Sequence, residues 1–161
     1  MPDAGSKLSV EDRLDIQELF AKYCWALDLG DADAFVNCFT EDGVFNHLWQ
    51  GQMQGHAAIR RAVQELWYDR HTWWLGRQHL ANHYLMTREG AGVRVKAFFS
   101  IVQYNTEYRT NFVFGIGTWD NVCVKQNGTW RFQSVQINAW MDKDKIPWAG
   151  ERPAPVVRAK G

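Results

Sequence analysis

The 161-residue sequence has no net charge and no long hydrophobic run. Eighteen Lys and Arg residues balance eighteen Asp and Glu residues, so the chain lacks the basic surplus that nucleic acids and anionic membranes attract. No segment approaches the roughly 20 apolar residues of a membrane span, and residues 1–10 lack the apolar core of a signal peptide. We therefore expect a cytoplasmic protein that has neither a nucleic acid nor a membrane as its partner.

Cysteines are few, and motifs for metals or nucleotides are missing. Cys24, Cys38 and Cys123 are scattered and lack the paired spacing of a disulfide framework, a redox motif or a zinc site. We expect them to be small buried side chains, which is the usual place of free cysteine. The histidines show no HxH or HExxH spacing, and no glycine-rich dinucleotide fingerprint is present. We therefore expect no metal and no cofactor.

Prolines are also few, and all four lie at positions 2, 147, 153 and 155. Residues 3–146 therefore contain no proline, a residue that interrupts helices and sheets. The length suits one domain that buries a core without disulfides. We predict a single domain over residues 1–161, with its core at about residues 8–144 and an irregular tail at residues 145–161.

Helical periodicity dominates the first part of the chain. Ser9 followed by Asp12 is typical of a helix start, and Gly30 is a natural helix end. Asp31 then has the side chain of a cap for a second, short helix. The apolar spacing predicts helices over about residues 10–29, 32–39 and 56–70.

Strand-like alternation follows from residue 78 onward. Asn127-Gly128 is the strongest hairpin signal in the sequence. Three helices followed by strands, without regular alternation of the two, indicate a segregated α+β fold. We predict a cone-shaped barrel in which a curved mixed or antiparallel sheet wraps around the helices and leaves an open mouth for a ligand. The predicted strands cover residues 44–49, 78–88, 92–106, 109–126 and 129–141, with a link or hairpin at 50–55.

Several short motifs follow one another in an informative order. The chain reads IQELFAKY at 16–23, ALDLGDADAF at 26–35, CFTEDGVF at 38–45, QGHAAI at 54–59 and GTWRF at 128–132. This series, spread over about residues 10–140, resembles the SnoaL-like proteins of the nuclear transport factor 2-like, or cystatin-like cone, superfamily. The resemblance implies the cone fold already expected from the element order.

The resemblance also implies a set of site residues. The superfamily contains dehydratases, isomerases, cyclases, epoxide hydrolases and binding domains, and this chain looks most like scytalone dehydratase-type lyases and lyases of lignin-derived aromatic dimers. The catalytic aspartate of that pattern falls on Asp28 and its histidine on His79. Its second catalytic histidine falls on Tyr104, its pocket tyrosine falls near Asn46, and the tyrosine before its aspartate is replaced by Leu27.

The chemistry of these side chains supports an acid–base site. A histidine exchanges protons near neutral pH, and a carboxylate on its other ring nitrogen fixes its tautomer. We therefore predict that His79 moves a proton, that Asp28 orients it, and that Tyr104 donates a hydrogen bond to a substrate oxygen. Arg77 is a cation for a carboxylate or phenolate. The alternatives are structural: an ordinary helix-end acid, a hydrogen-bonded core histidine, a rim tyrosine and a solvated arginine.

The large number of tryptophans points to a flat ligand. Nine Trp residues are present, and indole rings stack well on aromatic rings. Strand alternation places His83 on the same face as His79, and the register of the first strand decides between Asn46 and His47. The predicted substrate-binding residues are Tyr23, Trp25, Asn46, His47, Trp49, Trp73, Trp74, His83 and Phe98.

These observations favour a cofactor-independent lyase that acts on a phenolic or polyaromatic small molecule by acid–base elimination. A para-phenol can form a quinone methide, which allows water or formaldehyde to leave, as in diarylpropane lyases or scytalone-type dehydratases. Two alternatives stay open: an isomerase, cyclase or epoxide hydrolase on a polyketide or steroid, and a non-catalytic ligand-binding or dimerisation domain. We expect a homodimer or homotrimer in each case.

Overall fold

The computed structural model describes residues 7–68 and 76–141. The predicted tail at residues 145–161 lies outside the described part. In chain order the elements are α1 (Val10–Leu29), α2 (Ala32–Asn37), β1 (Phe39–His47), β2 (Gly51–Gln54), α3 (His56–Tyr68), β3 (Gln78–Glu89), β4 (Gly92–Asn105), β5 (Thr110–Gln126) and β6 (Thr129–Ala139).

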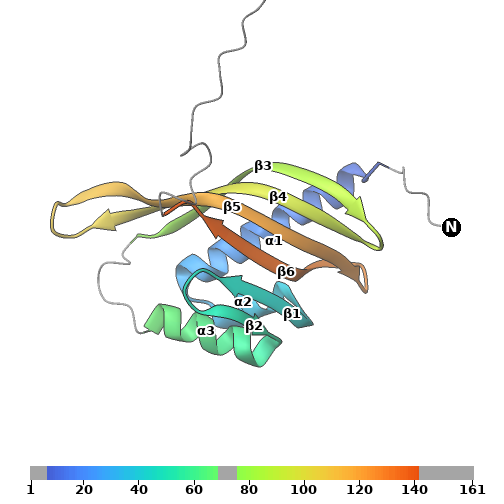
Figure 1. The fold of residues 1–161 in the computed structure, drawn as a ribbon, viewed down its shortest axis with the longest axis horizontal. Coiled ribbons are helices and arrows are strands. Elements are labelled where there is room, and N and C mark those ends of the chain that lie inside the picture. Colours follow the sequence, from blue (N-terminus) through green and yellow to red (C-terminus); the bar gives the residue numbers. More distant parts are fainter. Residues whose placement is uncertain (1–6, 69–75, 142–161) are drawn as a thin grey trace, which may run out of the picture.

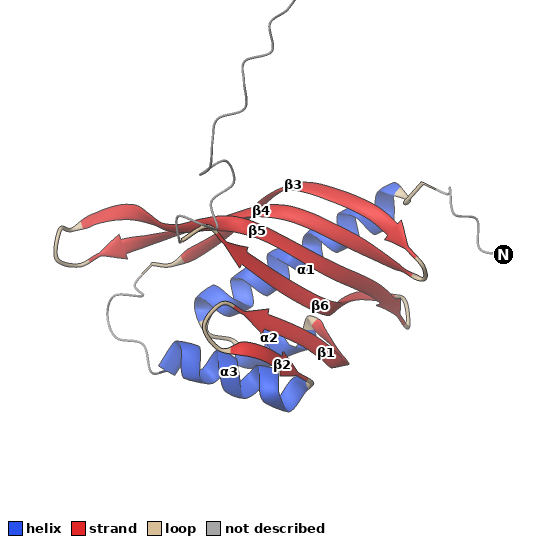
Figure 2. Ribbon diagram, in the orientation of Figure 1, coloured by secondary structure: helices blue, strands red, loops and turns tan. Residues whose placement is uncertain are grey.

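The six strands form one curved sheet in the order β2-β1-β6-β5-β4-β3. Neighbouring strands are antiparallel except for β1 and β6, which are parallel. The helices cover one face of this sheet, with α1 crossing behind β3 to β6 (Figures 1 and 2). The edges β2 and β3 do not pair with each other, so the cone is open. The predicted α+β cone with a mixed sheet is confirmed.

Helix ends are fixed by the caps that the sequence predicted. The Ser9 side chain accepts a hydrogen bond from the Asp12 N–H at 3.0 Å and begins α1. Gly30 ends α1 in the left-handed conformation, with φ of 76°. The Asp31 carboxylate then accepts a hydrogen bond from the Ala34 N–H at 2.9 Å and begins α2. This tight corner holds the last turn of α1 against the sheet.

The start of β1 differs from the prediction of a first strand at residues 44–49, before which the residues Thr40 to Gly43 are of turn-forming types. The strand begins at Phe39, which pairs with Phe132, and its register to β6 shifts before Val44. The hydroxyl of Thr40 donates a hydrogen bond to the Asp42 carboxylate at 2.9 Å. The turn-forming residues therefore produce an irregularity inside a strand rather than a turn before it, because parallel pairing with β6 captures the segment.

Aromatic rings fill the space between α1 and the inner face of the sheet. Trp119 is 1% exposed and stacks on Phe99, with ring centroids 5.2 Å apart. Gly117 makes this contact possible, since a Cβ atom there would lie 2.7 Å from the Phe99 ring and 2.3 Å from a carbonyl oxygen of β6. The core therefore forms one wall of the inner cavity.

The three cysteines are free and buried, as predicted. Burial raises the pKa of Cys38 to about 11 and that of Cys123 to about 12, so both stay protonated thiols. Burial likewise raises the pKa of Cys24. Within residues 7–68 and 76–141, no helix is long and apolar enough to cross a membrane.

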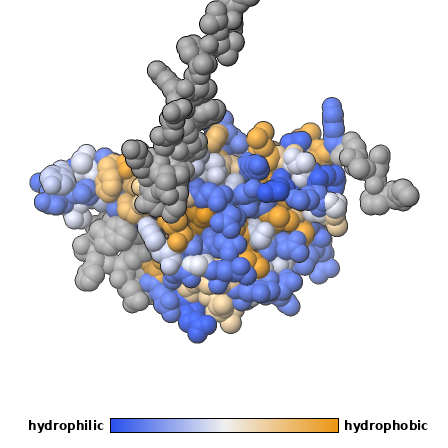
Figure 3. All heavy atoms as spheres, in the orientation of Figure 1, coloured by the Kyte–Doolittle hydropathy of each residue, from blue (hydrophilic) through white to orange (hydrophobic). Residues whose placement is uncertain are grey.

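The opposite face of the sheet is open to solvent and of mixed character. Phe98 and Ile116 are 47% and 42% exposed on this outer face. Arg94 on β4 donates two hydrogen bonds of 2.7 Å to Asp120 on β5. Figure 3 shows polar and apolar atoms side by side on the face of the molecule that Figure 1 presents. The inner face of these strands therefore contacts the core, whereas the outer face contacts solvent.

Candidate active site

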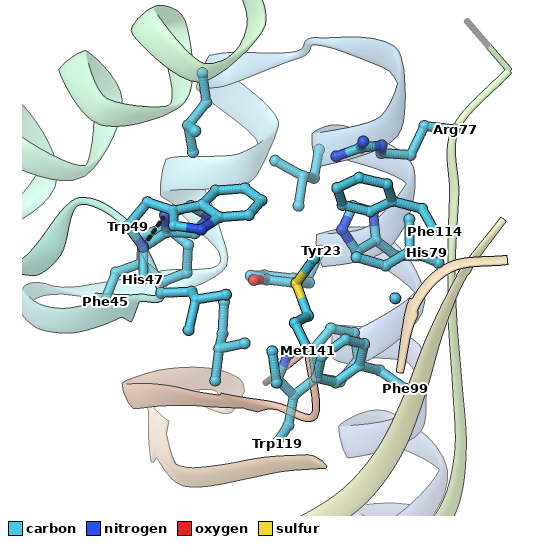
Figure 4. A pocket seen from close by; sticks show the side chains of 17 residues that line it. Tyr23, Phe45, His47, Trp49, Arg77, His79, Phe99, Phe114, Trp119 and Met141 are labelled. Atoms are coloured by element: carbon cyan, nitrogen blue, oxygen red, sulfur yellow. Dashed lines mark hydrogen bonds between the residues drawn. The ribbon is translucent and has the colours of Figure 1, made fainter. Parts of the chain in front are cut away.

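A pocket lies between α1, β1 and the inner face of β3 to β6, and 17 of the described residues line it (Figure 4). Its volume is about 610 Å³, part of it open to solvent. Aromatic side chains lie on two sides of this space (Figure 4). Its aromatic lining residues are Tyr23, Phe45, Trp49, Phe99, Phe114 and Trp119.

Asp28 and His79 form a hydrogen-bonded pair at this pocket. The Asp28 Oδ1 and His79 Nδ1 atoms are 2.5 Å apart. The second carboxylate oxygen of Asp28 accepts a hydrogen bond of 2.7 Å from the backbone N–H of His79. The side chains of His79 and Asp28 are 9% and 14% exposed. Two contacts thus tie the last turn of α1 to the first residues of β3.

This pairing fixes which nitrogen of His79 is available to a ligand. An ionised carboxylate only accepts hydrogen bonds, so Nδ1 of His79 carries a proton and donates a hydrogen bond to Asp28. The neutral imidazole then has its lone pair on Nε2. His79 lines the pocket whereas Asp28 does not, and no hydrogen bond reaches Nε2 from the residues described. The arrangement can accept a proton from a molecule in the pocket and stabilise the resulting imidazolium.

Asp28 gains from the same contacts. A carboxylate in the last turn of a helix is disfavoured by the helix dipole and needs a compensating partner. The backbone N–H and imidazole of His79 supply it. The structure thus brings together the two residues that the resemblance implied, over a separation of 51 positions.

Arg77 lies on the same side of the pocket as His79, and contacts with two side chains fix the position of its guanidinium group. It is 4% exposed, and its Nε and Nη2 donate hydrogen bonds to the Gln103 side-chain oxygen, the first at 2.9 Å. The guanidinium carbon lies 4.3 Å from the centroid of the Phe114 ring. A buried guanidinium held in this way favours an anionic or strongly accepting oxygen on a ligand.

His47 and Trp49 form the opposite wall, as Figure 4 shows. The sequence left Asn46 and His47 open, and the alternation of β1 places Phe45 and His47 in the pocket but not Asn46. Trp49 is 57% exposed at the mouth, with its ring centroid 6.4 Å from that of Phe114. The expectation for Asn46 is therefore wrong, and one register step explains the error.

Tyr23 lies in the middle of the pocket. It is 2% exposed, and burial raises its pKa well above the ordinary value of tyrosine. Among the described residues its hydroxyl has no hydrogen-bond partner. Tyr23 therefore lines the pocket, which is the position that the sequence predicted for it.

Tyr104 and Phe98 do not lie at the pocket, contrary to the prediction. The inner face of β4 carries Phe99 and Ile101, which line the pocket, and the buried Gln103. Tyr104 and Phe98 have the opposite parity and lie on the outer face. A pleated strand sends neighbouring residues to opposite faces, so a carry-over displaced by one residue selects the wrong side.

His83 is also outside the pocket, because β3 contains an extra residue. Asn82 pairs with Phe98 and Leu85 with Lys96, so three residue steps on β3 match two on β4. His83 has a φ of 54° and is exposed at this β-bulge. Before the bulge His79 faces inward, but after it the parity is reversed. Simple alternation from His79 could not reveal this.

Trp25, which was predicted to bind the substrate, does not line the described pocket. Trp25 is 68% exposed and points away from the sheet, two residues after the buried Tyr23 on α1. The predictions for Trp73 and Trp74 lie outside the described residues. In the described part of the chain, no group of three His, Cys, Asp or Glu side chains is arranged to hold a metal ion.

Gln103 and Phe114 were not predicted, although the sequence carries a partial signal for Gln103. Its spacing from Phe99 and Ile101 puts it on an apolar strand face, where a polar side chain requires a partner. Phe114 is harder to find, since the pairing of β4 and β5 shifts by one residue between Ile101 and Val102. Such shifts depend on the pairing of two strands rather than on one segment.

The comparisons with known proteins address the family and the fold. Residues 8–136 match the family model of the SnoaL-like domain. No curated protein matches the sequence.

Solved structures of the same fold come from several bacteria. A Nostoc punctiforme protein of unknown function with a cystatin-like fold has 22% identity and a TM-score of 0.71, over 83% of this chain and 95% of that one. A Novosphingobium aromaticivorans NTF2-like protein has 23% identity and a TM-score of 0.68, over 80% and 81%. Another protein from that bacterium, provisionally named an aromatic ring hydroxylase, has 23% identity and a TM-score of 0.70, over 84% and 94%. At these identities the similarity establishes the fold alone.

Proposed function

We propose that this chain, which belongs to the SnoaL-like domain family, is a cofactor-independent lyase acting on a phenolic or polyaromatic small molecule. One observation carries the proposal: the hydrogen-bonded pair of Asp28 and His79 presents an imidazole nitrogen to a pocket with aromatic walls. General acid–base catalysis needs a group that exchanges protons near neutral pH next to the reacting atoms. The aromatic walls select the ligand, and the pair supplies the chemistry.

The elimination needs only one group that both accepts and returns a proton. His79 Nε2 removes a proton from the carbon beside the leaving hydroxyl, and Asp28 stabilises the imidazolium that forms. The electron pair of the broken C–H bond forms the double bond while the C–O bond breaks. The imidazolium then protonates the departing oxygen, so that water leaves and His79 is again neutral.

A para-phenolic substrate allows a second course. Loss of the benzylic hydroxyl together with the phenolic proton, as water, gives a quinone methide, whose ring can accept an electron pair. His79 then removes the hydroxyl proton of a neighbouring hydroxymethyl group, and the carbon–carbon bond breaks to give formaldehyde. The electron pair of that bond forms the stilbene double bond while the ring returns to a phenolate, which the imidazolium of His79 protonates. Arg77 lies on the wall beside His79 and is suited to hold the phenolic oxygen through these steps.

The test is a set of phenolic diaryl alcohols and diols, followed by the absorbance of newly formed stilbene. We expect turnover by the wild type and a loss of about 100-fold to 10,000-fold in His79→Gln and in Asp28→Asn, the range for removal of general acid–base catalysis. His83→Gln is the matched control, since His83 lies on the exposed side of β3, and it should keep wild-type turnover.

Each other outcome has a clear meaning. Full turnover in both His79→Gln and Asp28→Asn would contradict the assigned mechanism. Consumption of the substrates without release of water or formaldehyde would instead indicate an isomerase or cyclase. Tight binding without any turnover would indicate a ligand-binding domain.

A further inference from the structure

Gln103 lies behind the part of the pocket wall that Arg77 forms. It is 2% exposed on β4 and does not itself line the pocket. The antiparallel register that pairs Gln78 with Val102 brings Gln103 beside Arg77. The side-chain oxygen of Gln103 accepts hydrogen bonds from both Nε and Nη2 of the guanidinium. One edge of the guanidinium is therefore fixed by a residue outside the pocket.

The Phe114 ring fixes the plane of the same guanidinium. The guanidinium carbon lies 4.3 Å from the ring centroid, which is a cation–π distance, and Figure 4 shows the group over that ring at the pocket. Arg77 is 4% exposed. An arginine side chain that is not held loses rotamer freedom when it binds a ligand, and this loss weakens binding. With an edge and a plane both fixed, the guanidinium is preorganised for an oxygen-bearing group in the pocket.

The chemical type of Gln103 matters as much as its position. A glutamate at this position could accept the same two hydrogen bonds and would add a negative charge next to the guanidinium. The neutral amide of Gln103 holds the guanidinium without neutralising it. Burial of a charge destabilises a protein unless an opposite charge compensates it. A guanidinium that stays cationic at a pocket wall therefore attracts an anion into the pocket.

The other side chains of the pocket do not oppose such an anion. Among the described residues, the other titratable groups that line the pocket are Tyr23, His47 and His79. Burial raises the pKa of Tyr23 well above its ordinary value, so its hydroxyl stays uncharged. The histidines are neutral or cationic and never anionic. The carboxylate of Asp28 contacts His79 and does not line the pocket.

We propose that Gln103 is a positioning and specificity-determining residue, which keeps Arg77 oriented and cationic so that the pocket binds phenols in their ionised form. This inference rests on the proposed function, because it takes the ligand to be a phenol. The ionised form is also the more reactive one. A phenolate that expels a benzylic hydroxide becomes a neutral quinone methide, and the hydroxide leaves as water with the proton that the phenol gave up.

The test uses two small aromatic probes. Para-nitrophenol changes its absorbance when it ionises near neutral pH, and para-nitroanisole, its methyl ether, cannot ionise. With protein in excess, the pH at which half of the bound para-nitrophenol is ionised gives the pKa of the bound phenol. Binding of para-nitroanisole is measured by calorimetry and reports whether the pocket is intact.

Three variants separate the charge of residue 103 from its hydrogen bonds. Gln103→Glu keeps an acceptor oxygen for Arg77 and adds one negative charge. Gln103→Met keeps the approximate size of the side chain but removes the acceptor without adding a charge. Gln78→Glu is the matched control, since Gln78 follows Arg77 in the sequence and is exposed. Thermal melting shows that each variant is folded.

We expect the wild type to lower the pKa of bound para-nitrophenol by about 1 or more relative to the free phenol, which is the effect of a nearby opposite charge. In Gln103→Glu this pKa should return to the value of the free phenol or rise above it. Gln103→Met should give an intermediate value, and Gln78→Glu should match the wild type. The affinity for para-nitroanisole should be the same in all of them.

Failure of the wild type to bind para-nitrophenol or to lower its pKa would overturn the inference, whatever the variants do. An undiminished lowering in Gln103→Glu or in Gln103→Met would overturn it as well. A parallel loss of para-nitroanisole binding in folded Gln103→Glu would show a purely structural role and would also contradict it. If Gln103→Glu does not fold, Gln103→Met decides by the same comparison.

These results are separate from those for the proposed function, because neither probe has a hydroxyl that can be eliminated. A protein that binds para-nitrophenol as its phenolate but converts no phenolic alcohol would contradict the lyase and leave the role of Gln103 standing. A protein that converts phenolic alcohols but does not lower the pKa of para-nitrophenol would do the reverse.

Discussion

The two faces of β4 differ in almost every property, although their residues alternate along one strand. Inward, Phe99 is 3% exposed against Trp119, and Gln103 is 2% exposed and bonds Arg77. Outward, Phe98 is 47% exposed, and Tyr104 is partly exposed. The role of a residue in this fold therefore depends on the face of the sheet that it occupies. A shift of one position moves a side chain from the pocket to solvent.

The largest difference in unfolding free energy should be that between alanine variants of the neighbouring residues Phe99 and Phe98. Phe99→Ala removes a buried ring from its stack on Trp119 and should lower the free energy of unfolding by about 3–5 kcal/mol. Phe98→Ala removes a half-exposed ring that contacts His83 and Trp140 and should cost about 1 kcal/mol or less. Urea unfolding followed by circular dichroism measures both. Equal losses of unfolding free energy in the two variants would contradict the difference between the faces and indicate that another copy of the chain covers the outer face.

A smaller difference in unfolding free energy is expected between variants of the neighbouring polar residues Gln103 and Tyr104. Gln103→Leu keeps the size of the side chain but removes the oxygen that accepts two hydrogen bonds from the buried Arg77. The cost in unfolding free energy should be about 1–3 kcal/mol. Tyr104→Phe removes an outer hydroxyl and should change it by about 0.5 kcal/mol or less. The same urea titrations decide, and a greater loss in Tyr104→Phe would reverse the assignment of the two faces.

The smallest effect should come from the outer ion pair and should depend on pH. The hydrogen bonds from Arg94 lower the pKa of Asp120. A carboxyl whose pKa is lower in the folded state stabilises the protein above its unfolded pKa of about 3.9, and this contribution disappears as the pH falls through the folded pKa. Asp120→Asn should therefore be less stable than the wild type at pH 6, with a smaller difference at pH 3. A difference that grows on acidification would contradict this.

Much of the fold followed from local signals. The caps at Ser9, Gly30 and Asp31 fix the helices, and the Asn127-Gly128 turn joins the last two strands. The sequence could not predict the irregular start of β1 at Phe39, because it arises from parallel pairing with a segment about 90 positions away in the chain. Local chemistry set the elements, and pairing between strands set their details.

The candidate site was predicted less completely, and for a related reason. Asp28 and His79 were implied by the resemblance to the family, and they lie at the end of α1 and the start of β3, before the irregular stretch of that strand. His83 lies at an irregular stretch of β3, where one extra residue reverses the side that faces inward, whereas Tyr104 was selected by a carry-over displaced by one residue. Their positions could not be deduced from a single strand taken by itself.

The most direct test of the inner acid–base pair is the nitrogen NMR spectrum of the histidine side chains, recorded above the pH range in which histidine titrates. We predict that Nδ1 of His79 carries the proton and donates a hydrogen bond to Asp28, and that the Nε2 resonance of His79 shifts when a phenolic diaryl alcohol is added. The resonances of His83, on the exposed side of the same strand, should not respond. A protonated Nε2 on neutral His79, or a ligand-induced shift at His83 but not at His79, would contradict the account.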